Sequence, residues 1–307
     1  ETADELHAAL RDYIEAAYHI SDEALIKQRR RLLNQPGVIR QVPFLESTPR
    51  YRPGKPFSEL GLPDAALEIL STVTTESDRG DRLLYDPPYD HQAAALGKTL
   101  VDEKSLVVTT GTGSGKTECF ILPILGRLAV EAREHGPRFG STAAVRALVL
   151  YPMNALVNDQ LARLRLLFGD PRIVEQFVDW SGRPARFARY TSRTLYPGVR
   201  DAKKDGQRLK PIGDYYVRNL QLAKEPASPA QQAAQTLVSE LKKRGKWPAK
   251  PDLESWFGKP GSRWQDSSTG QFRRCVTQSS DPELFTRHEV HAAPPDILVT
   301  NYSMLEY

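Results

Sequence analysis

The sequence has little cysteine and no long apolar run, and both shortages limit what this chain can be. Its two cysteines, Cys119 and Cys275, lie far apart and lack the spacing of metal ligands. This usage argues against a structural zinc site in this piece and is typical of a reducing cytoplasm, where we expect the protein to work. There is no run of about 18 apolar residues, so we expect no membrane span. The acidic, amphipathic start ETADELHAAL does not resemble a signal peptide.

Positive charge is concentrated in one part of the chain. Residues 181–260 contain 17 Lys or Arg against 7 Asp or Glu, whereas the remainder has 25 against 31. A basic block in an otherwise acidic chain favours a polyanionic partner, although a solvated, partly disordered insertion has the same composition. The block and the residues just after it could add a stacking surface, or could pack on another domain or a partner subunit. The aromatic residues in question are Tyr215, Tyr216, Trp247, Trp256, Phe257 and Trp264.

The first part of the chain is predicted to be helical. Thr2 and Glu5 form a capping box before an amphipathic stretch that ends near residue 17, and residues 21–23 can cap a second helix that ends at the turn over 34–37. Prolines at 43, 49, 53, 56 and 63 then favour extended pieces. We therefore expect residues 1–84 to form a helical accessory region with a long connector.

From residue 85 onward, apolar strands alternate with helices. The pattern predicts strands at 105–110, 145–151, 187–191 and 296–300, and helices at 117–132 and 154–168. This alternation predicts an α/β domain over 85–307 with a mostly parallel sheet covered on both faces. Residues from about 200 to 285 interrupt the rhythm as an insertion, in which only 228–243 is predicted to be helical.

A glycine-rich turn stands where the strand at 105–110 should end and a helix begin. The residues are TGTGSGKT at 110–117, close to a phosphate-binding loop, although the strict pattern has Gly where Thr110 stands. Free helix amides favour phosphate oxygens, and glycines let the backbone curl around the anion. Lys116 can reach the β- and γ-phosphates, and the Thr117 hydroxyl can coordinate Mg²⁺. We predict ATP or GTP binding, because the flanking strand and helix argue against a plain glycine-rich turn.

A glutamine upstream could recognise the base of that nucleotide. The side-chain amide of Gln92 can donate and accept, as reading the edge of adenine requires. Tyr85 or Tyr89 could stack on the base. We interpret His91 as a packing or capping residue, and the whole segment could also be a turn and a helix cap.

Two segments downstream end strands with polar residues. Residues 151–160 place a polar helix start after a strand, where its amides can meet a phosphate backbone. The strand at 296–300 leads into Thr300, Asn301 and Ser303, which are small donors suited to sugar-phosphate contacts. Taken singly, each segment could be an ordinary strand-to-helix loop.

Together these segments resemble the first RecA-like P-loop NTPase domain of a superfamily-two helicase, over about residues 85–307. Gln92 is similar to the adenine-reading glutamine, and TGTGSGKT is similar to the phosphate-loop motif, with Thr110 in place of the usual Ala. YPMNALVNDQ resembles the first nucleic-acid-contacting motif, and DILVTNYSML stands where relatives end a strand in Thr-Pro-Gly-Arg. YTSRT at 190–194 resembles an intervening segment of large helicases. LESTPRY and TNYSMLEY further resemble large bacterial DExH helicases of Druantia and DISARM anti-phage systems.

The resemblance implies an ATP-driven DNA helicase or translocase within a larger anti-phage defence protein. It would use ATP and Mg²⁺, bind single-stranded or forked DNA without sequence preference, and work with other defence subunits. The family's DExH box and second RecA-like domain are not found in these residues, so we expect the fragment alone to be inactive. A restriction-type duplex translocase and an ATP-gated DNA- or partner-binding scaffold are the alternatives.

The implied site residues fall into three groups. Lys116 and Thr117 would be catalytic, with Thr117 on Mg²⁺. ATP would contact Tyr85, Tyr89, Gln92, Thr112, Gly113, Ser114, Gly115, Lys116, Thr117 and Glu118. Nucleic acid would contact Pro152, Met153, Asn154, Gln160, Arg193, Thr300, Asn301 and Ser303.

Overall fold

The computed structural model describes residues 2–41, 50–76, 82–226 and 228–304, which belong to two compact units. The units span Glu1–Arg50 and Tyr51–Tyr307. Two of the prolines noted above, Pro43 and Pro49, lie outside the described residues. The boundary differs from the one expected near residue 84. Residues 57–73 contribute to the core of the second unit instead of forming a connector.

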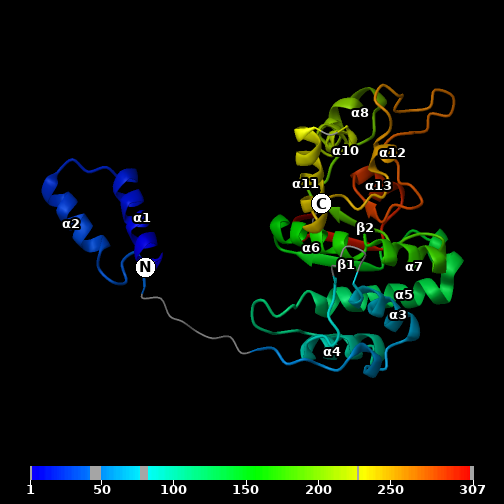
Figure 1. Ribbon diagram of the computed structural model, residues 1–307, viewed down its shortest axis with the longest axis horizontal. Coiled ribbons are helices and arrows are strands. Elements are labelled where there is room, and N and C mark those ends of the chain that lie inside the picture. The colour runs from blue at the N-terminus through cyan, green and yellow to red at the C-terminus, as the bar shows by residue number, and fades with distance from the viewer. Residues whose placement is uncertain (1, 42–49, 77–81, 227, 305–307) are drawn as a thin grey trace. The chain divides into compact units, whose positions relative to one another are not determined.

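Two helices make up the first unit, α1 (Thr2–Ala17) and α2 (Glu23–Leu33), as Figure 1 shows. Both confirm predicted helices. The Asp22 carboxylate caps α2 by accepting the Leu25 amide at 2.9 Å, and Arg30 pairs with Glu15 of α1 at 2.5 Å. Among the described residues, α1 buries none and α2 buries only Leu33. This unit therefore has little core of its own.

The second unit is built on four parallel strands. They are β1 (Ala147–Tyr151), β2 (Phe187–Tyr190), β3 (Glu283–Leu284) and β4 (Ile297–Asn301), in the order β1-β4-β2-β3. Ile297 of β4 lies opposite Ala147 on one side and Phe187 on the other. Strands β1, β2 and β4 confirm three predictions, and the parallel pairing confirms the α/β fold class. The two-residue strand β3 was not predicted.

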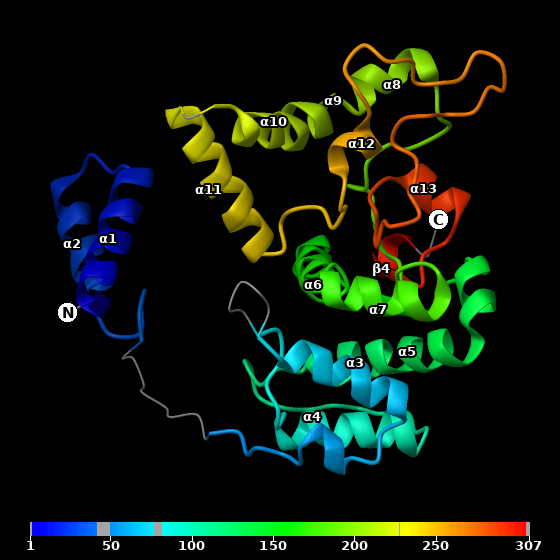
Figure 2. The same cartoon turned by 45° about the vertical axis from the view of Figure 1, so that its right-hand side comes forward.

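Helices pack with the sheet around one large apolar core. They are α3 (Asp64–Thr74), α4 (Asp90–Leu96), α5 (Glu118–Ser141), α6 (Asn154–Leu167) and α7 (Pro171–Ser181). Helix α5 contacts both α3 and α7, which Figure 2 shows beside it. The core joins Leu70 of α3, Leu125 of α5 and Val299 of β4. Helices α5 and α6 were predicted, whereas α3 and α7 were not. Within the described ranges, every helix is too short or too polar to span a membrane.

The strand predicted at 105–110 does not form, so that prediction is wrong. The segment pairs with no strand in the part of the chain that the structure describes, and Val107 is 92% exposed. An open pocket lies between Leu106 and Val108 of this segment, Phe120 of α5 and Ala147 of β1. A strand needs a neighbour that satisfies its backbone groups. The apolar residues of this segment are typical of a strand, but the sequence pattern does not show whether a neighbouring strand is present to pair with it.

The insertion over residues 200–285 folds around its own core. Its helices are α8 (Ala202–Arg208), α9 (Lys210–Ile212), α10 (Arg218–Lys224), α11 (Pro229–Lys243) and α12 (Leu253–Phe257), with a π-helical turn over Gly213–Val217. Helix α13 (Arg287–Ala292) follows β3. Only α11 was predicted, so the expectation of a single helix here is wrong. Trp247 and Trp256 are buried against Leu209, Ile212 and Cys275. These two tryptophans therefore cannot serve as an exposed stacking surface.

Buried ion pairs fix the insertion and the sheet to the surrounding helices. Glu283 of β3 accepts from Arg165 of α6 at 2.6 and 2.9 Å, and from the Ala249 amide at 2.7 Å. Asp296, just before β4, pairs with Arg146 and Arg183 at 2.7 Å each. Because a buried carboxylate needs both charge and hydrogen-bond partners, the Glu283 contacts tie α6 firmly to the insertion, and the Asp296 contacts fix the start of β4.

Candidate nucleotide site and nucleic-acid interface

The glycine-rich loop at residues 111–117, here called the phosphate loop, leads directly into α5. Gly113 and Gly115 have φ angles of 77° and 75°, a left-handed backbone that a residue with a Cβ rarely adopts. Within the described residues, none of the backbone amides of 112–117 donates a hydrogen bond. Six consecutive free amides at a helix N-terminus form a nest that fits phosphate oxygens. The loop therefore has the donors that a nucleotide tail requires.

Lys116 is exposed and donates to two carbonyls of its own loop region. Its ammonium lies 2.8 Å from the carbonyl oxygens of both Thr110 and Gly111. The Thr110 hydroxyl is 2.6 Å from that of Ser114, so the residue that departs from the strict pattern braces the loop internally. The Thr117 hydroxyl makes no hydrogen bond in the described part of the chain. Lys116 could exchange its carbonyl partners for phosphate oxygens, and the Thr117 hydroxyl is available to a cation.

Gln92 connects α4 to the phosphate loop. Its side-chain oxygen accepts the Tyr89 amide at 3.0 Å, and its nitrogen donates to the Gly115 carbonyl at 3.0 Å. A ring nitrogen of His91 lies 2.9 Å from the Ser114 carbonyl oxygen. Gln92 is buried, and both ends of its amide have partners in the protein. In this state it holds the loop, and reading a base would require it to exchange at least one of these bonds.

Aromatic side chains gather beside the same loop. Tyr85 is 75% exposed, whereas the ring of Tyr89 lies 5.5 Å from that of Tyr51. Tyr51 also reaches the loop, since a Cβ added to Gly111 would lie 2.9 Å from its hydroxyl. Backbone hydrogen bonds of 2.7 and 2.9 Å tie residues 52–54 to the turn before α4. Tyr51 was missed from the sequence, because only this pairing of two distant segments places it here.

An ion pair connects the phosphate loop to α6. Glu118, the first residue of α5, pairs with Arg163 of α6 at 2.5 Å. Arg163 is half exposed, so we expect the pair to contribute little to stability. The pair matters because of where it lies: it joins Glu118, directly after the phosphate loop, to α6, whose first residue Asn154 contacts the sheet edge. Burial, and then the neighbouring Glu118 carboxylate, raise the pKa of the Cys119 thiol.

The carboxyl ends of β1, β2 and β4 bring the second set of polar residues together. The Asn301 amide donates to the Asn154 side-chain oxygen at 2.8 Å, and the Thr300 hydroxyl donates to the Tyr190 carbonyl at 2.6 Å. Thr300 and Asn301 are buried, so their side chains mainly shape this edge. Of the predicted residues around them, Pro152, Met153 and Ser303 are exposed. We call this cluster the sheet-edge site.

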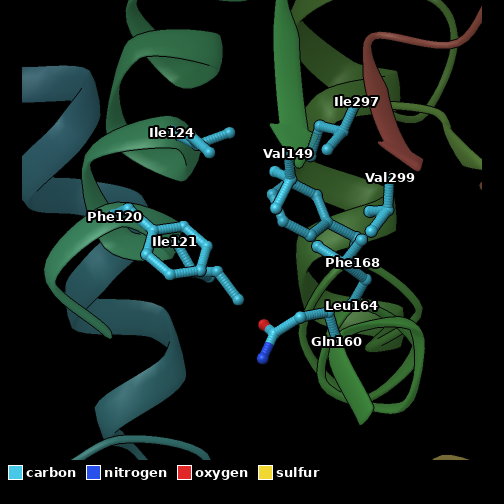
Figure 3. Close-up of a pocket in the computed structure, with 9 residues that line it drawn as sticks. All are labelled: Phe120, Ile121, Ile124, Val149, Gln160, Leu164, Phe168, Ile297 and Val299. Atoms are coloured by element: carbon cyan, nitrogen blue, oxygen red, sulfur yellow. The ribbon is translucent and has the colours of Figure 1, made fainter. Parts of the chain in front are cut away.

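Gln160 lies apart from the sheet-edge site. Figure 3 shows it beside a narrow apolar crevice between α5, α6 and the sheet, with no room for a water molecule, lined by Phe120, Leu164 and Val299 among others. It is 7% exposed, and its side-chain oxygen has no partner among the described residues. Gln160 shares the buried stripe of α6 with Leu164, four residues on, whereas Asn154 faces the strand ends. Residues of one sequence motif are thus divided between two faces of a helix.

The sheet-edge site is extended by two residues that were not predicted, Arg189 and Asn158. Arg189 of β2 donates to the Asn158 side chain of α6 at 2.6 Å and to the Arg193 carbonyl at 3.4 Å. Arg193 itself is exposed. Burial, and then the nearby Arg165, lower the pKa of Arg189. The packing of α6 against β2 brings Arg189 and Asn158 together, and the sequence of β2 alone does not predict this contact.

Comparison with known proteins agrees with this geometry. Residues 89–190 match the DEAD/DEAH box helicase family. Over its full length the chain is 45% identical to Druantia protein DruE of Escherichia coli and spans 16% of that protein. It is 31% identical over 42% of its length to the mitochondrial DEAD-box ATP-dependent RNA helicase 47 of Arabidopsis thaliana. It is 25% identical over 69% of its length to the ATP-dependent helicase YprA of Bacillus subtilis. No solved structure matches the chain.

The chain spans less than a quarter of the length of each of these relatives. The predicted resemblance to superfamily-two helicases of the Druantia type is confirmed. The parallel sheet and the phosphate loop before α5 are the structural counterpart of that match. Residues 89–190 therefore resemble a DEAD/DEAH box helicase domain, within a chain that has a RecA-like α/β fold.

Proposed function

We propose that this chain is the nucleotide-binding lobe of an ATP-driven DNA helicase or translocase in bacterial anti-phage defence. One observation carries the proposal: six free amides and Lys116 lie at one end of a contact path that leads through α6 to the sheet-edge site. The 45% identity to DruE supports a role in defence. Hydrolysis would belong to a longer protein, since the chain spans 16% of that relative.

The phosphate loop would hold the nucleotide tail. The amides of 112–117 would donate to phosphate oxygens, and Lys116 would leave the carbonyls of Thr110 and Gly111 to meet the β- and γ-phosphates. The Thr117 hydroxyl would hold Mg²⁺, which when bound neutralises phosphate charge during phosphoryl transfer. Gln92 and Tyr89 would lie toward the base.

The path from the loop to the strand ends would couple the nucleotide to nucleic acid. Glu118 follows the loop directly and pairs with Arg163 of α6, and α6 begins at Asn154, which contacts Asn301. A displacement of α6 would change the sheet-edge site and the loop together. Affinity for a nucleic-acid backbone would therefore differ between nucleotide states, as a motor requires. Backbone contacts would be sequence-tolerant and weakened by salt.

Substitution of Lys116 tests the proposal in the full-length protein. Lys116→Ala should lower ATPase activity at least ~100-fold, because the developing phosphate charge loses its cation. Lys104→Ala removes another exposed lysine nearby and should leave the rate unchanged. Normal turnover in Lys116→Ala would refute the nucleotide site.

Substrate assays separate the three candidate functions. A helicase displaces a strand from a forked duplex, whereas a duplex translocase displaces only a triplex-forming strand. A scaffold binds ATP without nucleic-acid-stimulated turnover. We favour the helicase because the sheet-edge site is formed by strand ends and short loops suited to a single backbone.

A further inference from the structure

One stripe of α6 leads from the sheet-edge site to the insertion. Its members follow one another at spacings of four, four and three residues: Asn154, Asn158, Ala162 and Arg165. Their contacts run in the same order to Asn301 of β4, Arg189 of β2, Gly245 after α11 and Glu283 of β3. Helix α6 therefore crosses the strands and joins their carboxyl ends to the end of α11.

The turn after α11 is held tightly against α6. Gly245 has a φ of 64°, and a Cβ there would lie 2.2 Å from the Ala162 carbonyl oxygen. Next to it, Trp247 is buried in the core of the insertion. From Asn154 to Ala162 the helix rises about 12 Å, at ~1.5 Å per residue. The end of α11 is thus fixed at about this distance along α6 from the sheet-edge site.

The same turn carries a concentration of positive charge. Lys243, Arg244 and Lys246 are all exposed, and we call these three residues the α11 basic end. Arg244 pairs with Glu240 at 3.9 Å. The side chains of Lys243 and Lys246 make no ion pair or hydrogen bond within the described residues. The three positive charges of the α11 basic end therefore outnumber the Glu240 carboxylate that pairs with Arg244.

We infer that the α11 basic end binds the phosphate backbone of the same nucleic-acid strand that the sheet-edge site grips. The inference rests on the proposed function and adds a second contact to it. A separation of about 12 Å corresponds to roughly three or four nucleotides of a base-stacked strand, at ~3.4 Å of axial rise each. The exposed Arg193, which Arg189 connects to Asn158, lies beside the same stripe of α6. Trp247 and Trp256 contribute no stacking here, because both are internal.

The salt dependence of binding tests this contact in the full-length protein. Affinity for a 20-nucleotide poly(dT) strand is measured across a range of salt for Lys243→Gln/Lys246→Gln and for wild type. Each lost phosphate contact lowers the slope of log K against log salt by about 0.7 for a single strand. The double variant should therefore lose about 1.4 from the slope and, at ~0.1 M salt, about 25-fold in affinity. The control, Lys203→Gln/Lys259→Gln, removes the same charge from α8 and the loop after α12, and should behave as wild type.

A charge-preserving variant separates electrostatics from structure. Lys243→Arg/Lys246→Arg should retain the wild-type slope. Loss of affinity in that variant, or equal slopes for the Gln variant and its control, would overturn the inference. Equal slopes are also the result expected if the surface serves an acidic protein. If wild type itself does not bind poly(dT) in any nucleotide state, the proposed function fails instead, so the two failures are distinguishable.

Discussion

Two glycines of the phosphate loop provide a matched pair for testing how the loop is held. Gly113 and Gly115 have nearly the same φ, 77° and 75°. A Cβ at Gly113 would meet nothing within 4 Å, whereas one at Gly115 would lie 2.4 Å from the Gln92 side-chain nitrogen. Alanine at either position incurs the same left-handed backbone strain, about 1–2 kcal/mol. The two substitutions therefore differ in what happens to Gln92 and, to a lesser extent, to the Glu118 carboxylate, which the added Cβ would approach to 2.9 Å.

The displacement of Gln92 sets the expected difference. In Gly115→Ala the amide must move, and the bonds to the Gly115 carbonyl and the Tyr89 amide are lost or weakened. A hydrogen bond contributes about 1 kcal/mol, and a buried polar group left without a partner costs about 1–3 kcal/mol. We expect Gly115→Ala to destabilise the loop by about 2 kcal/mol more than Gly113→Ala does. That difference corresponds to a roughly 30-fold larger opening constant.

Hydrogen exchange on the full-length protein without nucleotide measures this difference. Peptides covering residues 88–120, resolved by mass spectrometry, should exchange about 30-fold faster in Gly115→Ala than in Gly113→Ala. Adding Gln92→Ala to Gly115→Ala should cost less than the sum of the single effects, because the clash is already removed. Equal exchange in the two alanine variants would show that Gln92 does not hold the loop.

Three further predictions concern the path to nucleic acid and the buried thiol. Arg163→Ala should reduce DNA stimulation of ATPase several-fold, whereas Arg133→Ala, which breaks an ion pair whose arginine is equally exposed, should not; equal stimulation would exclude the path through α6. Asn301→Ala should weaken single-strand binding about 5- to 10-fold, because the Asn154 oxygen loses its partner; unchanged affinity by fluorescence anisotropy would contradict this. Burial raises the pKa of Cys275 to about 12, so almost no thiolate is present at pH 8. Iodoacetamide should therefore label it only after unfolding, and rapid labelling of native protein in peptide maps would be inconsistent with this core.

Features that depend on local pattern were predictable from the sequence. Strands β1, β2 and β4 are short apolar runs between polar loops, and α5 and α6 follow from helical periodicity. The phosphate loop is recognisable because three glycines, a lysine and a threonine are rare in so short a stretch. The order of these elements along the chain was enough to predict a parallel α/β sheet.

Features that depend on distant partners were not predictable. Residues 105–110 have the apolar content of a strand, but they pair with no strand in the described part of the chain. Gln160 sits in a polar motif, yet its helical phase places it on the buried stripe of α6. Tyr51 reaches the phosphate loop only through backbone pairing with the turn before α4. In each case a contact between segments far apart in sequence decides the outcome.

A liganded structure of the full-length protein with a non-hydrolysable ATP analogue and Mg²⁺ tests the central claim most directly. We predict that the phosphates lie on the amides of residues 112–117. We also predict that the Lys116 ammonium has left the carbonyls of Thr110 and Gly111, to which it now donates at 2.8 Å. A triphosphate bound elsewhere, with Lys116 still on those carbonyls, would contradict the account.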